Sequence, residues 1–361
     1  MSTATQQSET PTVADQVRAE VERAFLRNIK GLNYFTTSDP PTGLTPKDAI
    51  YSSGTLRLYH YRPLASEVYR VPVVLVMSLL CKPYIFDLAP SQSLVEFLLK
   101  QGYDVYMIDW GVPRPEDSRL RIENYVLDFL PECIRRIGAD SGEPDLSVFG
   151  YCMGGQLSLM YAAAHPDGPL KNLICLTTPI DSTGMKMFRQ WTDPRYFDVD
   201  RIVDTLGNVP PEMLISAFDM LKPAAKIASQ IRLWDNIWND AFVKSYRMID
   251  RWANDQIPFA GECFRQYHKE VLWENKLHDG QMVLRRRPIK LDMVRVPLLA
   301  IMAEHDHIVP LESASDLLSL VGSQDKQEVL LKGGHVSVLA GPNAKNRMWP
   351  AVDRWLSERS I

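Results

Sequence analysis

The chain has 361 residues, 45% of them hydrophobic and 23% charged, an ordinary globular composition that can bury a large core. The formal net charge is −4 and no run of lysine and arginine suggests phosphate-backbone binding, so we expect no nucleic-acid partner. Apolar runs such as 71–80 fall far short of the roughly 20 residues that cross a bilayer, which excludes a transmembrane segment.

The N-terminus is polar and lacks the charged start and apolar stretch of a secretory signal. The cysteines are scattered, without the paired spacing of a zinc site or a disulfide framework. We therefore expect reduced thiols and a cytoplasmic protein. The five cysteines are Cys81, Cys133, Cys152, Cys175 and Cys263.

Residues 1–40 form a segment of their own. Residues 1–12 are expected to be a disordered tip. From Val13 to Leu32, apolar residues recur every three or four positions, which predicts an amphipathic helix. The sequence Asp-Pro-Pro-Thr-Gly at 39–43 ends this helix.

Strands and helices then alternate along the chain. Polar and apolar residues alternate at 55–61, which predicts a half-buried strand. Further strands are predicted at 71–77, 104–108, 146–149, 173–177, 296–303 and 327–331. Helices are predicted at 93–101, 122–137, 154–165, 311–320 and 343–356. Such alternation predicts the α/β class, with a mostly parallel sheet covered by helices on both faces.

The alternation stops between residues 179 and 291, where Trp, Met, Pro and Asp are frequent. We interpret 179–291 as a mainly helical cap inserted over the active site, and 41–178 with 292–361 as the core. Periodic apolar residues predict helices in this cap at 211–221, 242–252 and 264–271.

The sharpest local motif is Gly-Tyr-Cys-Met-Gly-Gly at 150–155, directly after one predicted strand and before a predicted helix. This is the context of the nucleophile elbow of the α/β-hydrolase fold, with Cys152 in place of the usual serine. The turn aims the Met153 N–H at the reacting carbonyl oxygen, beside the positive end of the helix. Cys152 is therefore the candidate nucleophile, and the alternative is a small buried cysteine in a glycine-rich turn.

An acid and a histidine follow the nucleophile in this fold, each in a loop after a strand. Asp306 lies in the loop after the strand at 296–303, and His335 follows two glycines after the strand at 327–331. We predict a triad of Cys152, Asp306 and His335. The alternative is that Asp306 and His335 only cap the segments that follow them.

Two further possibilities remain around these residues. Glu304, His305 and His307 could suggest a metal site. No other residues of the sequence have the spacing of metal ligands, so no metal is expected. Asp109 also ends a predicted core strand and is the second candidate for the acid.

With these residues in place, the chain resembles the catalytic subunit of the short, two-component polyhydroxyalkanoate synthases, classes III and IV. The resemblance runs from about Gly43 to Trp355. Besides the cysteine motif, it rests on Lys82-Pro83-Tyr84 with Asp87-Leu88 and on segments 106–111, 204–210, 306–310 and 333–335.

The resemblance implies polymerisation of (R)-3-hydroxyacyl-CoA thioesters into a polyester, with CoA release and no cofactor. It implies that Cys152 carries the growing chain, that His335 deprotonates this thiol, and that Asp306 helps to activate the 3-hydroxyl of the incoming substrate. A backbone N–H at about Leu79 is expected to be the second oxyanion donor, beside Met153. The resemblance also implies a second synthase subunit, homodimerisation and association with polyester granules.

Two other functions stay open. A cysteine-dependent hydrolase of the dienelactone type would share the triad, but such enzymes lack a cap of this length. An inactive granule-associated scaffold could keep the fold without the chemistry, because a fold alone does not guarantee activity.

Overall fold

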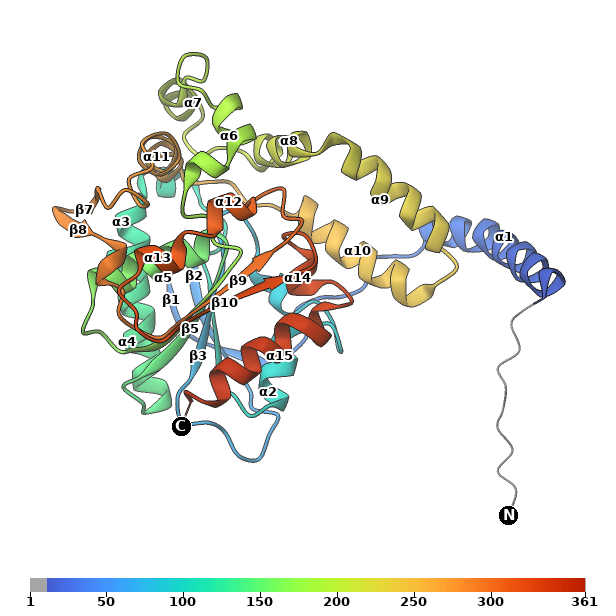
Figure 1. The fold of residues 1–361 in the computed structure, drawn as a ribbon, viewed down its shortest axis with the longest axis horizontal. Helices are drawn as coiled ribbons and strands as arrows, with labels where there is room; N and C mark the ends of the chain where they lie inside the picture. The colour runs from blue at the N-terminus through green and yellow to red at the C-terminus, as the bar shows by residue number, and fades with distance from the viewer. Residues whose placement is uncertain (1–11, 361) are drawn as a thin grey trace. The chain divides into compact units, whose positions relative to one another are not determined.

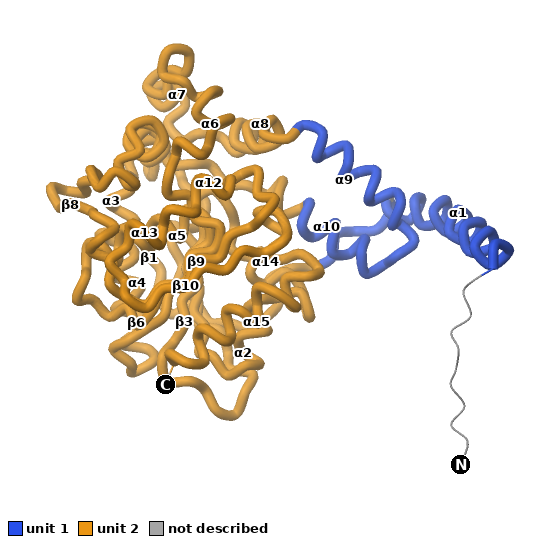
Figure 2. The backbone as a smooth tube through the Cα atoms, in the orientation of Figure 1, with its two compact units in different colours: residues 1–40, 223–250 blue, residues 41–222, 251–361 orange. Residues whose placement is uncertain are grey.

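The computed structural model describes residues 12–360, so nearly all of the tip expected at 1–12 lies outside the described residues (Figure 1). The chain divides into two compact units (Figure 2). One unit contains the chain up to Pro40 together with Pro223–Asp250, and the other contains Pro41–Lys222 and Arg251–Ile361. The segment expected to form the cap, 179–291, is thus shared between them.

The larger unit is built on an eight-stranded sheet in the order β1-β2-β4-β3-β5-β6-β9-β10. The outer strands β1 and β2 pair antiparallel, as do β2 and β4, and the remaining pairs are parallel. The strands are β1 (Lys47–Ser53), β2 (Leu56–Tyr61), β3 (Val73–Val76), β4 (Val105–Asp109), β5 (Leu146–Tyr151), β6 (Leu170–Leu176), β9 (Leu298–Ala303) and β10 (Lys326–Leu331). The predicted mostly parallel sheet is confirmed.

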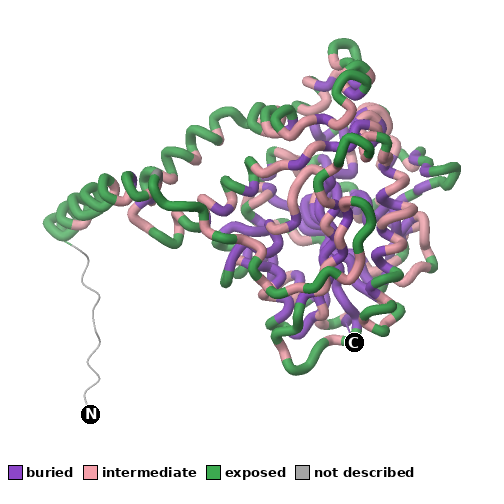
Figure 3. Tube along the Cα trace, turned by 180° about the vertical axis from the view of Figure 1, so that it is seen from behind, coloured by how far each residue is buried: buried purple, intermediate pink, exposed green. Residues whose placement is uncertain are grey.

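The central strands are hydrophobic because both faces of the sheet are covered. Every residue of β3, β5 and β9 is buried, as Figure 3 shows for the interior of this unit. The covering helices include α2 (Leu94–Lys100), α3 (Ile122–Asn124), α4 (Leu130–Ser141), α5 (Met153–Ala164), α12 (Leu311–Ala314), α13 (Leu317–Leu320), α14 (Ser337–Ala340) and α15 (Ala344–Ser357). A π-helical turn, η3 (Tyr125–Phe129), separates α3 from α4 within the predicted helix at 122–137.

The part of 179–291 that belongs to this unit is mainly helical. It contains α6 (Lys186–Trp191), α7 (Val199–Leu206), α8 (Pro211–Leu221), α11 (Gly261–Gln266) and the π-helical segment η5 (Tyr267–Trp273). A short hairpin of β7 (Met282–Leu284) and β8 (Arg287–Ile289) follows, which the apolar periodicity did not predict.

The smaller unit contains α1 (Val13–Thr36), α9 (Pro223–Asn236) and most of α10 (Asp240–Asn254). Thr12 begins α1 through a capping box with Asp15, whose N–H donates to Thr12 Oγ1 at 3.2 Å. Lys30 Nζ lies 2.6 Å from Asp240 Oδ1, and Gly31 faces the ring of Trp234. Among the described residues, no helix combines the length and apolar character needed to span a membrane.

Candidate active site

Cys152 lies at the junction of β5 and α5, where the chain turns from strand to helix. Its φ and ψ are 56° and −121°, in a region that a residue with a side chain seldom occupies. Such strain persists only where the surroundings enforce it, and it is common at catalytic positions. The predicted elbow geometry is therefore present, and it holds the thiol at the carboxyl end of a central strand.

Close approach of the backbone explains the glycines around the thiol. A Cβ on Gly154 would lie 2.2 Å from the carbonyl oxygen of Val76, so α5 could not begin this close to β3 with any other residue. A Cβ on Gly150 would lie 2.6 Å from the Cα of Gly155. These contacts need the absence of a side chain, so the glycines set the tightness of the turn.

Asp306 and His335 meet at the same end of the sheet. Asp306 follows β9 and His335 follows β10, and the His335 Nδ1 lies 2.7 Å from the Asp306 Oδ2. Both side chains are buried. Parallel strands end at one edge, which is why residues 29 positions apart can pair there.

Both carboxylate oxygens of Asp306 have hydrogen-bond partners within the protein. Its Oδ1 accepts the backbone N–H groups of Ile308 at 2.9 Å and Val309 at 2.8 Å, while Oδ2 faces His335. Its side chain is 0% exposed. Asp306 thus caps the following turn and orients the histidine, and it does not itself face the open space beside Cys152.

The pKa of His335 is controlled by its neighbours. Burial opposes the charged imidazolium, but the charges of Asp306 and Cys152 outweigh it and raise the pKa of His335 to about 10. Cys152 therefore lies close enough to His335 for electrostatic coupling. A thiol and an imidazole coupled in this way can form an ion pair in which the sulfur is the nucleophile.

Tyr151 supports the histidine, a contact that the sequence motif did not reveal. Its hydroxyl donates to the backbone carbonyl of His335 at 3.2 Å, and the two rings lie 5.0 Å apart. Tyr151 is fully buried, and burial raises its pKa well above the usual value, so the hydroxyl stays protonated. The only signal in the sequence was its place beside Cys152 in the elbow.

A cavity of about 530 Å³ opens beside Cys152, within the range of small-molecule sites. Its walls come from the elbow, from Leu80 after β3, and from α6, α8, α11 and η5, and they are mainly aromatic, aliphatic and methionine side chains. Phe188, Phe218 and Phe264 are among them. Such a space suits an acyl chain, and its apolar walls disfavour water beside the thiol.

The two backbone groups expected to bind an oxyanion follow the neighbouring parallel strands β5 and β3. Met153 is the first residue of α5, and Leu79 follows β3. Neither N–H donates to another residue in the described part of the chain. The next N–H, that of Leu80, donates to Ser78 Oγ at 3.3 Å.

The other candidates from the sequence have different surroundings. Asp109 Oδ1 accepts the N–H of Gly111 at 2.9 Å, and burial raises the pKa of this carboxyl. It is Asp306, and not Asp109, that contacts His335. Glu304, His305 and His307 do not form a metal-ligand cluster within the described chain.

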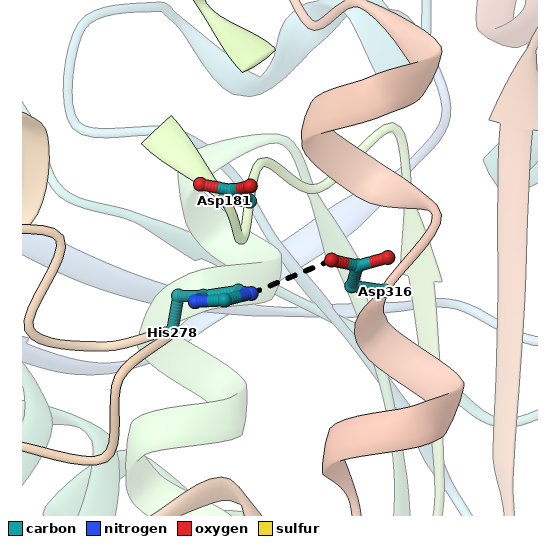
Figure 4. Close-up of side chains that lie close together, drawn as sticks. All are labelled: Asp181, His278 and Asp316. Atoms are coloured by element: carbon teal, nitrogen blue, oxygen red, sulfur yellow. Dashed lines mark hydrogen bonds and ion pairs between the residues drawn. The ribbon is translucent and has the colours of Figure 1, made fainter. Parts of the chain in front are cut away.

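One group with ligand-like spacing does occur among residues 12–360. Asp181, His278 and Asp316 could each place one atom within 4.8 Å of the others (Figure 4). His278 is engaged, however, with Asp279 Oδ1 at 2.7 Å and Asp316 Oδ2 at 3.4 Å. Burial opposes its charge, but these acids raise the pKa of His278, which favours an ion pair over metal binding.

Two family models match the chain. Residues 85–342 match the alpha/beta hydrolase fold, and residues 41–98 match the N-terminus of poly-beta-hydroxybutyrate polymerase (PhaC). The first covers most of the sheet and all three predicted catalytic residues.

Several similar proteins are named poly(3-hydroxyalkanoate) polymerase subunit PhaC. The one from Allochromatium vinosum is 35% identical over 88% of this chain and 90% of its own length. That of Synechocystis sp. is 33% identical over 92% of this chain and 89% of its length. That of Haloferax mediterranei is 34% identical over 90% of this chain, which spans 66% of that longer protein.

Solved structures agree on the fold. MenH from S. aureus has a TM-score of 0.53 at 18% identity, covering 86% of this chain and all of its own. A thermophilic esterase from Thermogutta terrifontis has a TM-score of 0.52 at 16% identity, covering 88% of this chain and all of its own. At this identity the likeness concerns the fold alone, and it confirms the predicted α/β-hydrolase class.

Proposed function

The chain belongs to the PhaC family of poly(3-hydroxyalkanoate) polymerases, which are acyltransferases, and we propose that it polymerises (R)-3-hydroxyacyl-CoA thioesters into polyester with release of CoA. The observation that supports this most is a cysteine on the nucleophile elbow, coupled to a buried His–Asp pair and open to an apolar cavity. We assign it to the two-component type, class III or IV.

In the loading step, His335 Nε2 takes the proton from Cys152, and the thiolate attacks the thioester carbonyl carbon. The Met153 and Leu79 N–H groups stabilise the oxyanion. The bond to the CoA sulfur breaks, CoA takes the proton from the imidazolium and leaves, and the acyl group remains on Cys152. Asp306 holds the imidazole in the tautomer that this transfer needs.

In the elongation step, His335 takes the proton from the 3-hydroxyl of the next hydroxyacyl group. The resulting oxygen attacks the acyl-cysteine carbonyl, an ester bond forms, the bond to the Cys152 sulfur breaks, and this sulfur takes the proton back from His335. The lengthened chain is then a CoA thioester, which reloads Cys152 by the loading step and releases its CoA. The Asp306 carboxylate is enclosed by three hydrogen-bond donors, so it does not contact the 3-hydroxyl directly. We therefore propose that Asp306 helps to activate this hydroxyl indirectly, by orienting His335. Apolar walls favour attack by the alcohol over water.

The product of the reaction tests this function against a hydrolase. We expect purified protein with (R)-3-hydroxybutyryl-CoA to release CoA and form an oligomeric or polymeric ester, detected by a thiol assay and mass analysis of the products. A dienelactone-type hydrolase would instead yield only free 3-hydroxybutyrate. CoA release at the uncatalysed rate would support an inactive scaffold.

We also propose that the chain works with a second synthase subunit, as a homodimer and on polyester granules, and that α1 contributes to this association. The apolar residues of α1 point outward in the described chain, between 40% and 76% exposed. A long helix gains little stability from exposed apolar groups, so a partner or granule surface would bury them. They are Val13, Val17, Val21, Phe25, Leu26, Ile29 and Leu32.

Deleting residues 1–35 should preserve folding and weak basal activity while reducing stimulation by the partner subunit or attachment to granules. A sharper variant combines Val17→Gln with Phe25→Gln, which leaves the Lys30–Asp240 pair intact. Glu20→Gln on the same helix is the control. Co-sedimentation with granules and CoA-release rates with and without partner measure the effect.

Two outcomes would contradict this role of α1. If the variants keep full stimulation and granule binding, the helix is dispensable for association. If the truncated chain aggregates while Val17→Gln with Phe25→Gln behaves as wild type, the helix mainly stabilises its own unit.

A further inference from the structure

His268 is a buried histidine that the proposed mechanism does not use. It lies in η5, is 8% exposed, and lines the same cavity as Cys152. Its ring stacks on Phe197 at 5.5 Å and lies 4.0 Å from the ring of Phe264. The neighbouring residue, Tyr267, lies close to Cys152. Burial raises the pKa of Tyr267, and the charge of Cys152 raises it further. The cavity therefore connects the imidazole with the nucleophile.

The hydrogen bonding of His268 fixes its tautomer. Nδ1 lies 3.0 Å from the backbone carbonyl oxygen of Phe264, and a carbonyl oxygen can only accept, so Nδ1 carries the proton. Burial lowers the pKa of His268 to about 4, so the ring is neutral near pH 7. Nε2 is consequently a bare acceptor, and it makes no hydrogen bond with any residue among 12–360.

Two hydroxyl groups that line the cavity together with His268 are already bonded within the protein. The Thr192 hydroxyl donates to the carbonyl of Phe188 at 2.7 Å, and the Tyr267 hydroxyl donates to Gln156 Oε1 at 3.1 Å. Nε2 is not among the fully buried unpaired atoms of the described residues, so it is accessible from the cavity that His268 lines, and an acceptor among apolar walls favours a ligand that brings a donor. A neutral acceptor selects a hydroxyl rather than an anion.

We propose that His268 Nε2 accepts a hydrogen bond from the free 3-hydroxyl of the hydroxyacyl substrate and so selects hydroxyacyl over unsubstituted acyl thioesters. This assignment rests on the proposed polymerase function and adds a specificity residue to it. The ring is a poor base, so it positions the hydroxyl while His335 moves the proton. A site built around a hydroxyl discriminates strongly against the analogue that lacks it.

The test compares single-turnover loading of Cys152 by (R)-3-hydroxybutyryl-CoA and by butyryl-CoA. In the wild type we expect the hydroxyacyl thioester to load faster. His268→Phe, which keeps the stacking on Phe197, should lower the ratio of the two rates by roughly tenfold to a hundredfold. The rate with butyryl-CoA should stay within a few-fold of wild type, which a folding defect would not allow. His268→Leu provides a second apolar replacement.

Two controls separate hydrogen bonding from packing. His268→Gln can place an acceptor oxygen near the position of Nε2 and should restore part of the preference. His165→Phe is the matched control, because His165 Nδ1 makes the same kind of bond to Tyr161 O at 3.0 Å but lies outside the cavity. The preference of this variant should equal that of wild type.

An unchanged ratio of loading rates in both His268→Phe and His268→Leu would overturn the role of His268 while leaving the polymerase function intact. A ratio that falls equally in His165→Phe would overturn it as well. If neither thioester loads the wild-type protein, the proposed function itself fails, and this assignment fails with it.

Discussion

Cys152→Ala should abolish CoA release from (R)-3-hydroxybutyryl-CoA, with a loss of roughly 10⁴-fold or more, because the variant lacks the thiol coupled to His335. Cys81, another thiol near the elbow, does not replace it, because burial raises its pKa well above the usual value and keeps it protonated. Folding should be retained, since the thiol lies at a cavity wall and its side chain hydrogen-bonds to His335, a residue of the site and not of the core. Thiol release and thermal unfolding measure the two effects.

Cys133→Ala is the matched control, because Cys133 is buried in α4, away from the cavity. This variant should lose some stability and keep its activity. Cys152→Ser should be far weaker than wild type, because a serine alkoxide is much harder to form than a thiolate. Activity of Cys152→Ala near that of wild type would refute the thiol mechanism.

The second large effect is expected at the His–Asp pair. His335→Gln removes the base and should block loading of Cys152. Asp306→Asn should also reduce loading, by roughly 10³- to 10⁴-fold, because an amide beside Nδ1 no longer holds the required tautomer. Both expectations follow from the 2.7 Å contact and the enclosed carboxylate. Radiolabelled substrate trapped on the protein measures loading, and polymer yield measures elongation.

The two steps distinguish an indirect from a direct role of Asp306. If Asp306 served the 3-hydroxyl itself, Asp306→Asn would load normally and elongate poorly, and that result would contradict our assignment. Asp109→Asn is the control, because the amide oxygen can still accept the Gly111 N–H and the residue has no contact with His335. It should load within a few-fold of wild type.

Much of the fold could be predicted because it depends on local patterns. The buried strands β3 and β9 are continuous apolar runs, β5 is interrupted only by Ser147 before the elbow, and the elbow motif needs glycine for contacts that a Cβ would block. Strand β1 was missed because its sequence, Lys-Asp-Ala-Ile-Tyr-Ser-Ser, is largely polar and partly exposed at the sheet edge.

Features that depend on contacts between distant segments could not be predicted. The grouping of 223–250 with the N-terminal residues depends on pairs such as Lys30 with Asp240, which leave no periodic signal. The same holds for the support of His335 by Tyr151 and for the place of His268 in the cavity. A single histidine in a helical segment gives the same sequence pattern whether its side chain packs in the core or binds a ligand.

The most direct test of the account is to locate the covalent acyl group. Protein mixed with (R)-3-hydroxybutyryl-CoA, quenched in acid and digested, should carry 3-hydroxybutyryl mass on the peptide that contains Cys152, and Cys152→Ala should carry none. Label on a different residue, or equal labelling of Cys152→Ala, would contradict the claim that this thiol carries the growing chain.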